Sequence, residues 1–318
     1  MKPALPLLTL AASLTLIRPA SAAVDQGLLS LVPESTVLLT GVDADSTKSS
    51  EFGQYFLQKL NTEDPNFQKF MEDTGFDPRR DLQTFLFAGF GPRHAHGPSK
   101  FAILARGTFD ASRISATAKV KASFTRQSYS GVTVFVHPEK NGYNAFAFPD
   151  TGLAVLGDLD TVKEIIDHRA SPTVLDPALV QRVSKVGPAN DIWFASLLSG
   201  ALFGNHMDLT GAGSQLKDSS ALQSILQSNG GVHFGDQVKF SLDATTRSPQ
   251  DAVSLTDVVR FVSSMVQTQR RNDPNAAIVA SALDHMELQT NGAELHVGFS
   301  LSEKNLELLA QSHSKREY

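Results

Sequence analysis

The sequence contains no cysteine among its 318 residues. This absence excludes disulfide bonds, thiolate metal ligands, thiol nucleophiles and a lipid anchor attached through cysteine. The fold must therefore be stabilised by its hydrophobic core. A chain of this length can bury most of its apolar surface without covalent links.

Long apolar segments are also scarce, and the most marked one lies at the N-terminus. Lys2 is followed by ALPLLTLAASLTLI and then by RPASAA, whose small residues have the A-x-A spacing of a signal peptidase site. The run is shorter than the ~20 apolar residues that a membrane span requires. We predict that residues 1–22 are a secretory signal peptide cleaved after Ala22, with cleavage after Ala23 or an uncleaved anchor as alternatives. The mature chain is then secreted or periplasmic.

No later segment is apolar for long enough to cross a membrane. The longest candidate, IWFASLLSGALFG at 192–204, is interrupted by glycine and serines, whereas a span needs about 18 continuous apolar residues. The mature chain is therefore expected to have no transmembrane segment.

The signatures of several common functional classes are missing as well. The net charge is −5 and no run of basic residues is longer than a short pair, which excludes the basic surface that nucleic-acid binding requires. No G-x-S-x-G elbow, H-E-x-x-H zinc site, P-loop or complete dinucleotide fingerprint is present. These absences favour a non-enzymatic protein without a cofactor. A Ser-His-Asp site assembled from distant residues keeps an exported hydrolase as an alternative.

What is present is a repeated pattern of short alternating strands followed by a helix. Asn141-Gly142 is a strong hairpin signal, and counting outward from it pairs Phe135 with Phe148 and His137 with Phe146. Such units predict an α+β fold, an antiparallel meander sheet built from repeated hairpin–helix units with the helices packed on one face. In the first half, strands are expected at 36–42, 82–90, 100–109, 123–129, 131–140, 143–149 and 152–158.

The second half repeats the pattern. Ser248-Pro249 begins a helix whose expected buried stripe includes Val258 and Phe261, and a second Asn-Gly hairpin is expected to pair Glu287 with His296. The segment between the halves is proline-containing and less periodic. We therefore predict an N-terminal domain at 23–178 and a C-terminal domain at 179–318, which can still pack as one unit.

One element of the first half resembles a known group of proteins. MEDTGFDPRRDLQTFLF contains a Thr-Gly-x-Asp-Pro-x-x-Asp-Leu element, and ARGTFDASRI, YSGVTVF and AFAFPDTGLAVLGDLDTVKEIID follow it. Together these segments, mainly within residues 70–170, resemble a group of exported, uncharacterised bacterial proteins. The resemblance implies an exported α+β fold and carries over no catalytic residue.

Two pairs of polar residues have side chains that could bind a metal ion. His94 and His96, in GPRHAHGPSK, would share a face if extended, but no third ligand lies nearby, so a surface loop between two strands is favoured over a metal site. Asp43 and Asp45 could hold Mg²⁺, although an aspartate-rich loop before a helix is the commoner meaning. The pairing expected for Glu287 and His296 favours a cross-strand contact over acid–base catalysis.

Aromatic residues suggest one further site. Phenylalanine is abundant, with twenty residues against a single tryptophan, and its alternation in strands favours core packing. The alternative is an apolar groove near Trp193, Phe194 and Phe203 that binds an acyl chain or a peptide. We therefore expect an exported non-enzymatic protein that binds an unknown partner or apolar ligand. An exported hydrolase and a structural envelope protein are the alternatives.

Overall fold

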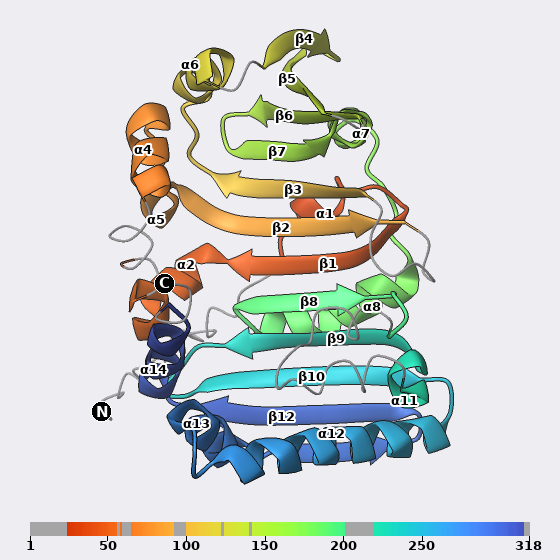
Figure 1. Cartoon of the computed structure of the whole chain (residues 1–318). Coiled ribbons are helices and arrows are strands. Elements are labelled where there is room, and N and C mark those ends of the chain that lie inside the picture. The colour runs from red at the N-terminus through yellow and green to blue at the C-terminus, as the bar shows by residue number, and fades with distance from the viewer. Residues whose placement is uncertain are drawn as a thin grey trace, which may run out of the picture.

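The computed structural model describes residues 24–55, 58, 65–91, 100–121, 124–139, 142–200 and 219–314. Its strands form one twelve-stranded sheet in the order β11-β12-β10-β9-β8-β1-β2-β3-β7-β6-β5-β4 (Figure 1). Every neighbouring pair of strands is antiparallel. The predicted α+β class with an antiparallel sheet is thereby confirmed.

The first half of the chain supplies seven of the twelve strands. Its elements are α1 (Gln26–Leu29), β1 (Thr36–Asp43), α2 (Ala44–Ser49), α4 (Pro65–Thr74), α5 (Pro78–Asp81), β2 (Leu82–Phe90), β3 (Lys100–Gly107), α6 (Ala111–Lys121), β4 (Thr125–Tyr129), β5 (Val132–Glu139), β6 (Gly142–Asp150), β7 (Leu153–Asp158) and α7 (Leu159–His168).

The second half supplies the remaining five strands. Its elements are α8 (Pro177–Val186), the 3₁₀ helix η1 (Gly187–Ala189), β8 (Ile192–Ser196), α11 (Ser220–Gln223), β9 (Ile225–His233), β10 (Val238–Thr246), α12 (Pro249–Gln269), α13 (Pro274–Leu283), β11 (Glu287–Asn291), β12 (Glu294–Leu301) and α14 (Glu303–Ser314).

Most helices begin where the sequence places a short polar side chain. Ser248 accepts a hydrogen bond from the Asp251 backbone N–H at the start of α12, as expected. Asp158 caps α7, and Asp160 lies in the first turn of this helix. Both aspartates precede the same apolar stripe, so the sequence pattern alone does not show which of them is the cap. An acidic side chain in the first turn also interacts favourably with the helix dipole.

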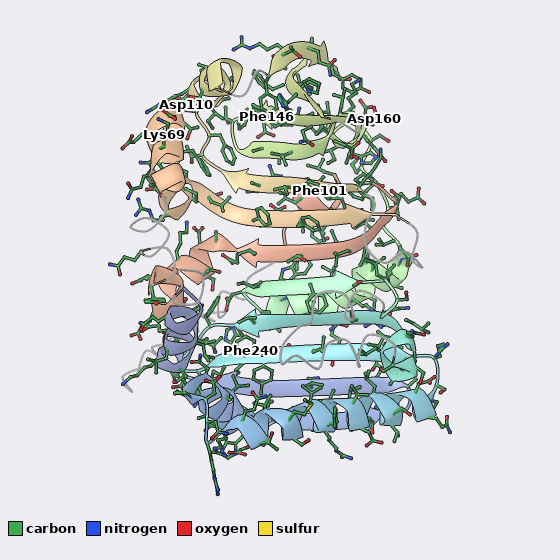
Figure 2. All side chains as sticks on the ribbon, in the orientation of Figure 1. Lys69, Phe101, Asp110, Phe146, Asp160 and Phe240 are labelled. Atoms are coloured by element: carbon green, nitrogen blue, oxygen red, sulfur yellow. The ribbon has the colours of Figure 1, made fainter. Side chains whose placement is uncertain are left out.

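Alternation along the strands divides the sheet into two faces. We call the face that carries Leu39, Leu104 and Trp193 the back face, and the face that carries Phe101 and Phe240 the front face. The registers connect each set across the sheet, since Leu39 pairs with Ala195 and Ala88 while its neighbour Thr40 pairs with Phe194 and Phe87. Figure 2 shows Phe101, Phe146 and Phe240 along the front face.

The larger helices lie on both faces of the sheet. Ile165 of α7 and Leu179 of α8 are fully buried in the core on the back face, together with Leu104. Leu255 of α12 packs on the front face with Ala244 and Leu295, and α12 lies in front of the strands in Figure 1. Helices α7 and α8 therefore share the back face, whereas α12 and the pocket-lining residues of α6 lie on the front face.

Both predicted hairpin registers are wrong by two residues. Phe135 pairs with Phe146 rather than Phe148, and His137 pairs with Asn144. A shift of two residues keeps each side chain on its predicted face, because the strand period is two. The phenylalanines therefore still share a face, and the Phe135 and Phe146 rings stack with centroids 4.7 Å apart.

In the second hairpin, Asn291 pairs with Glu294, so that the turn residues are Gly292 and Ala293. Glu287 consequently lies opposite Gly298, and His296 lies between Gln289 and Asp243. The predicted Glu287–His296 pair is therefore wrong.

The sheet runs without interruption from the first half into the second. Strands β1 and β8 join the halves, with Leu38 opposite Ser196 and Val42 opposite Ile192. The predicted division between residues 178 and 179 falls inside α8, whose Leu179 belongs to the same core as Leu39 of β1. A division of the chain into two domains stays a prediction. Among the described residues, no helix combines the length and apolarity needed to cross a membrane.

Candidate ligand-binding pocket

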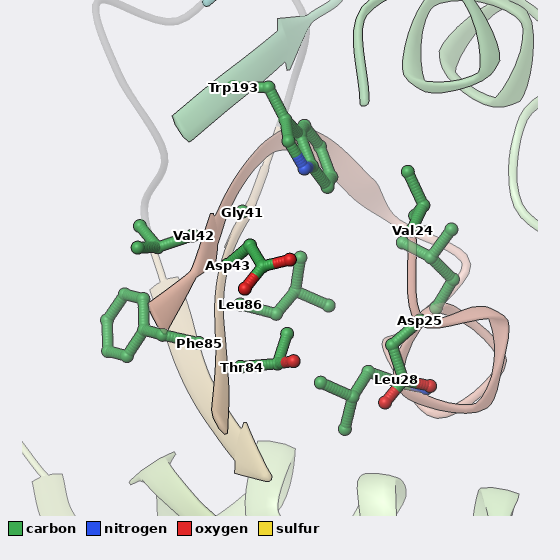
Figure 3. A pocket seen from close by; sticks show the side chains of 11 residues that line it. Val24, Asp25, Leu28, Gly41, Val42, Asp43, Thr84, Phe85, Leu86 and Trp193 are labelled. Carbon is green, nitrogen blue, oxygen red and sulfur yellow. The ribbon is translucent and has the colours of Figure 1, made fainter. Parts of the chain in front are cut away.

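The aromatic residues predicted to bind a ligand lie on opposite faces of β8. Trp193 is 6% exposed, and its indole lies so close to Gly41 that a Cβ there would be 2.3 Å from the ring (Figure 3). The adjoining hollow measures about 30 Å³, which is room for one or two water molecules. Phe194 lies half-buried on the front face, and Phe203 is outside the described residues.

The predicted metal ligands find other roles or lie outside the described residues. His94 and His96 lie outside the described residues. Asp43 caps α2 by accepting the Ser46 N–H at 2.9 Å, and Asp45 forms an ion pair with Lys48 at 2.7 Å. Within the described ranges, no group of three or more histidine and carboxylate side chains could hold a metal.

His296 belongs to a polar cluster on the back face. Its Nδ1 lies 2.7 Å from Asp243 Oδ1. Asp243 Oδ2 also accepts a hydrogen bond from Asn229 at 2.9 Å and lies 3.1 Å from Lys185 Nζ of α8. No serine or threonine hydroxyl among the described residues is hydrogen-bonded to His296, so the pair lacks the nucleophile of a hydrolase triad.

A hollow lined mainly by apolar side chains lies on the front face of the first half, and we call it the front-face pocket. Its volume is about 380 Å³, within the ~300–1,000 Å³ typical of small-molecule sites. No charged side chain is among the described residues that line it. The lining residues are Thr74, Phe76, Ile103, Ala105, Phe109, Ile114, Thr117, Phe146, Ala147, Phe148, Ala154, Val155 and Leu156.

The polar atoms of this lining are already hydrogen-bonded. The Thr117 hydroxyl donates to the Asp73 carbonyl at 2.9 Å, and the Thr74 hydroxyl accepts from the Phe76 N–H at 3.2 Å. Leu156 is 44% exposed, which places apolar surface at the mouth of the pocket. The pocket therefore presents hydrocarbon and aromatic surface to whatever enters it.

Aromatic stacking forms one wall of the pocket. Phe109 stacks on Phe76 at 5.3 Å and meets Phe148 at 5.7 Å, and Phe146 meets Phe148 edge-on at 5.9 Å. Such ring pairs contribute about 0.5–1.5 kcal/mol beyond their buried area. The wall is therefore held in place by its own contacts before a ligand binds.

Helices α4 and α6 form the rim, and a cationic side chain of α6 holds them together. The Arg113 guanidinium donates to the carbonyls of Glu72 and Asp73, which end α4. This contact also complements the negative end of the helix dipole. Gly75 follows at φ +72°, a left-handed conformation that suits glycine, and a Cβ there would lie 2.6 Å from Arg113.

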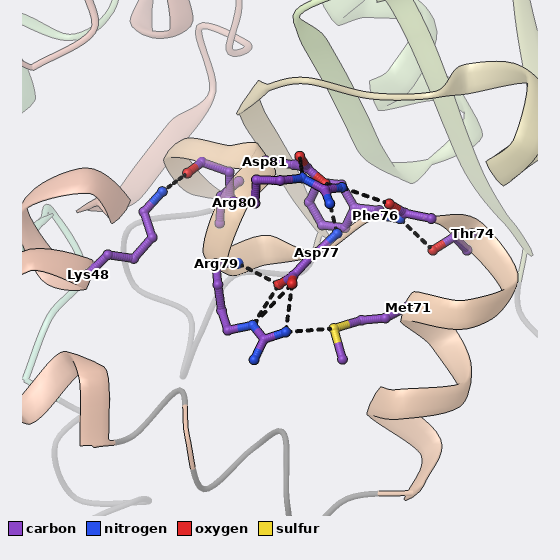
Figure 4. Close-up of polar contacts among 10 residues, drawn as sticks. Lys48, Met71, Thr74, Phe76, Asp77, Arg79, Arg80 and Asp81 are labelled. Carbon is purple, nitrogen blue, oxygen red and sulfur yellow. Dashed lines mark hydrogen bonds and ion pairs between the residues drawn. The ribbon is translucent and has the colours of Figure 1, made fainter.

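The Thr-Gly-x-Asp-Pro-x-x-Asp-Leu element builds the connection from this rim to β2. Asp77 accepts the Arg79 backbone N–H at 3.0 Å, and its own N–H donates to Asp81 at 2.8 Å (Figure 4). The hydrogen bond from the Arg79 side chain lowers the pKa of Asp77, and that from Arg80 lowers the pKa of Asp81. The element thus closes a tight helical turn between α4 and β2.

A second hollow, of about 400 Å³, lies on the other side of α6, and we call it the Arg126 hollow. It is lined by Ala111, Ser112 and Ser115 of α6 and by Arg126, Gly131, Val132, Thr133, Phe135, Phe148 and Pro149. Phe148 lines both hollows, so they adjoin. The Arg126 guanidinium lies over the Phe135 ring, 5.3 Å from its centroid, which is a cation–π contact.

Sequence reasoning missed this pocket, although it predicted most of the strands that line it. The Phe146 and Phe148 alternation indicated an apolar face, and the face was assigned to the core. The missing information is tertiary, because the pocket is completed by the packing of α6 on α4. The small residues Ala105 and Ala154, which pair with each other across β3 and β7, were the available signal for a hollow.

Comparisons with known proteins add little to this description. No family model matches the chain, and no curated protein matches it. A solved structure described as "Structure of crystal form I of TP0453" is similar, with 10% sequence identity and a TM-score of 0.49. The similarity covers 92% of this chain and 98% of that chain. At this level it carries no argument about function, and the resemblance of residues 70–170 to exported bacterial proteins stays a prediction.

Proposed function

We propose that the mature chain is an exported, non-enzymatic protein that binds a small apolar ligand in the front-face pocket. The observation that carries the proposal is a pocket of about 380 Å³ whose lining holds no charged side chain. Burial of apolar surface drives such binding, at about 25 cal/mol per Å². The polar cluster of Asp243 and His296 supports an exported hydrolase less well, because the histidine lacks a hydroxyl partner in the described part of the chain.

Export is the second part of the proposal, and it rests on the N-terminal sequence. The apolar run and the A-x-A spacing before Ala22 support a cleaved signal peptide. The intact mass of the chain recovered from the medium or periplasm is expected to lack residues 1–22. The same purified chain then serves for the binding experiment.

The binding experiment titrates the mature chain with N-phenyl-1-naphthylamine, an uncharged probe whose fluorescence rises in apolar surroundings. The variant Ala154→Phe places a ring in the hollow, since Ala154 lines the front-face pocket. We expect the probe to bind the wild type and its affinity for this variant to fall at least about tenfold.

Ala170→Phe is the matched control, because Ala170 is exposed in the turn after α7. It makes the same chemical change away from the pocket and is expected to leave the affinity unchanged. Equal binding by the wild type and Ala154→Phe would contradict the proposed site.

A further inference from the structure

The hollow beside the front-face pocket contains a cation whose charge is not neutralised by the described protein. Arg126 forms no hydrogen bond or ion pair with another described residue, and only its contact with the Phe135 ring holds it in place. Carboxylates in the neighbourhood are already engaged. Asp110 caps α6 through the Arg113 N–H at 3.0 Å, and Asp150 lies 3.7 Å from Arg169.

The arginine of α6 serves the fold. Arg113 is directed to the last carbonyls of α4 on the opposite side of α6. Arg126 is therefore the guanidinium left to receive an anion, and its planar fork matches a carboxylate or another oxyanion.

The two hollows adjoin along α6 and share one lining residue. Ala111 and Ser115 line the helix side of the Arg126 hollow, and Phe148 forms a floor common to both hollows. The Ser115 hydroxyl donates to the Ala111 carbonyl, so it adds no free polar group.

We infer that the ligand is an anionic amphiphile, whose single alkyl chain lies in the front-face pocket and whose head group pairs with Arg126 on the other side of α6. This inference rests on the proposed function, since it assigns a chemical class to the same ligand. Charge complementarity commits it to an anion rather than a neutral or cationic head group.

The test displaces the neutral naphthylamine probe with decanoate, decanol and decylamine at pH 8, which share one chain and differ in head-group charge. For the wild type we expect decanoate to bind about tenfold more tightly than decanol, and decylamine to bind most weakly. For Arg126→Gln, decanoate should fall to the affinity of decanol, while decanol and the probe are unaffected.

Two further variants separate charge from packing. Arg126→Lys keeps the cation and is expected to retain a preference for decanoate, and probe binding reports that each variant is folded. Arg260→Gln removes an exposed cation of α12 and should change none of the affinities. Equal affinities for decanoate and decanol in the wild type, or equal losses of both in Arg126→Gln, would overturn the inference while leaving the apolar site intact. If neither the probe nor any alkyl ligand binds the wild type, the proposed function itself fails.

Discussion

At the scale of single residues, Asp243 joins the helix layer of the back face to the sheet. Its side chain is 15% exposed and contacts His296, Lys185 and Asn229. Burial alone would raise its pKa, but the hydrogen bonds from these three side chains outweigh burial and lower the pKa below the ordinary value of 3.8. The ionised carboxylate is therefore stabilised by the folded state.

This shift predicts how the stability of the protein depends on pH. A carboxylate with a lowered folded-state pKa contributes stability that is present above its unfolded pKa, near 3.8, and is lost as the pH falls through the folded value. We expect Asp243→Asn to reduce the free energy of unfolding by about 1–2 kcal/mol at pH 7. The difference from the wild type should shrink below about pH 4, as measured by urea denaturation across pH 3–7.

A second substitution controls for the loss of one negative charge. Asp257 pairs with Arg260 on α12, where both side chains are 67% exposed and 3.6 Å apart. Such exposed pairs contribute little, so Asp257→Asn should change the free energy of unfolding by at most a few tenths of a kcal/mol at every pH. A pH-independent effect of Asp243→Asn would show that its charge is not what stabilises the fold.

Local residue roles could be predicted from the sequence wherever one residue type satisfies one geometric need. The helix start at Ser248 is confirmed, because a cap depends on the conformation of a few neighbouring residues. Trp193 differs, since its slot is formed by Gly41 on a strand far away in the sequence. A lone tryptophan in an apolar run gives no sign of such a partner.

At the scale of elements, the sequence of α12 predicted the helical spacing of its apolar residues but not which of them face the core. Phe261 was expected to face the core and is 52% exposed, whereas Leu255 is 3% exposed and packs with Ala244 and Leu295. Both residues belong to apolar sets with helical spacing. Which of the two residues faces the core depends on how α12 lies against the front face of the sheet. The sequence of the helix does not specify this placement.

This difference predicts unequal costs for two similar truncations in one helix. Leu255→Ala leaves a cavity in the second core and is expected to lower the free energy of unfolding by about 2–4 kcal/mol. Phe261→Ala removes a half-exposed ring and should cost less than about 1 kcal/mol. Thermal and urea denaturation of both variants measure the contrast, and a larger cost for Phe261→Ala would mean that this side of α12 is covered.

Hairpin registers illustrate a second limit at this scale. An Asn-Gly pair indicates a turn but does not decide which residues occupy its two central positions. Gly142 already pairs with Glu139 inside the first hairpin, whereas Gly292 is a turn residue with φ +58° in the second. Both registers therefore differ from prediction by two residues, in opposite directions. Each side chain still lies on its predicted face, because side chains alternate between the two faces along a strand.

At the scale of the whole molecule, the join between the halves could not be predicted from local pattern. β1 lies between β2 and β8, so that Leu38 meets Ser196. Hairpins pair neighbours in sequence, but this contact closes a long loop, and no turn signal marks it. The same long-range placement brings Arg182 of α8 to Gln227, Asn229 and Thr245 in the second half.

These contacts predict that the two halves unfold together. Trp193 is the single tryptophan of the chain and lies in the core shared by β1, β8 and α8, so its fluorescence reports on the junction. Far-ultraviolet circular dichroism reports on all helices and strands. We expect the two signals to follow one urea transition with the same midpoint, because α8 contributes to the core of the first half and binds the sheet of the second. Cooperative single units show such coincidence. Separate midpoints, with tryptophan fluorescence changing apart from the dichroism, would instead support two domains divided near residue 179.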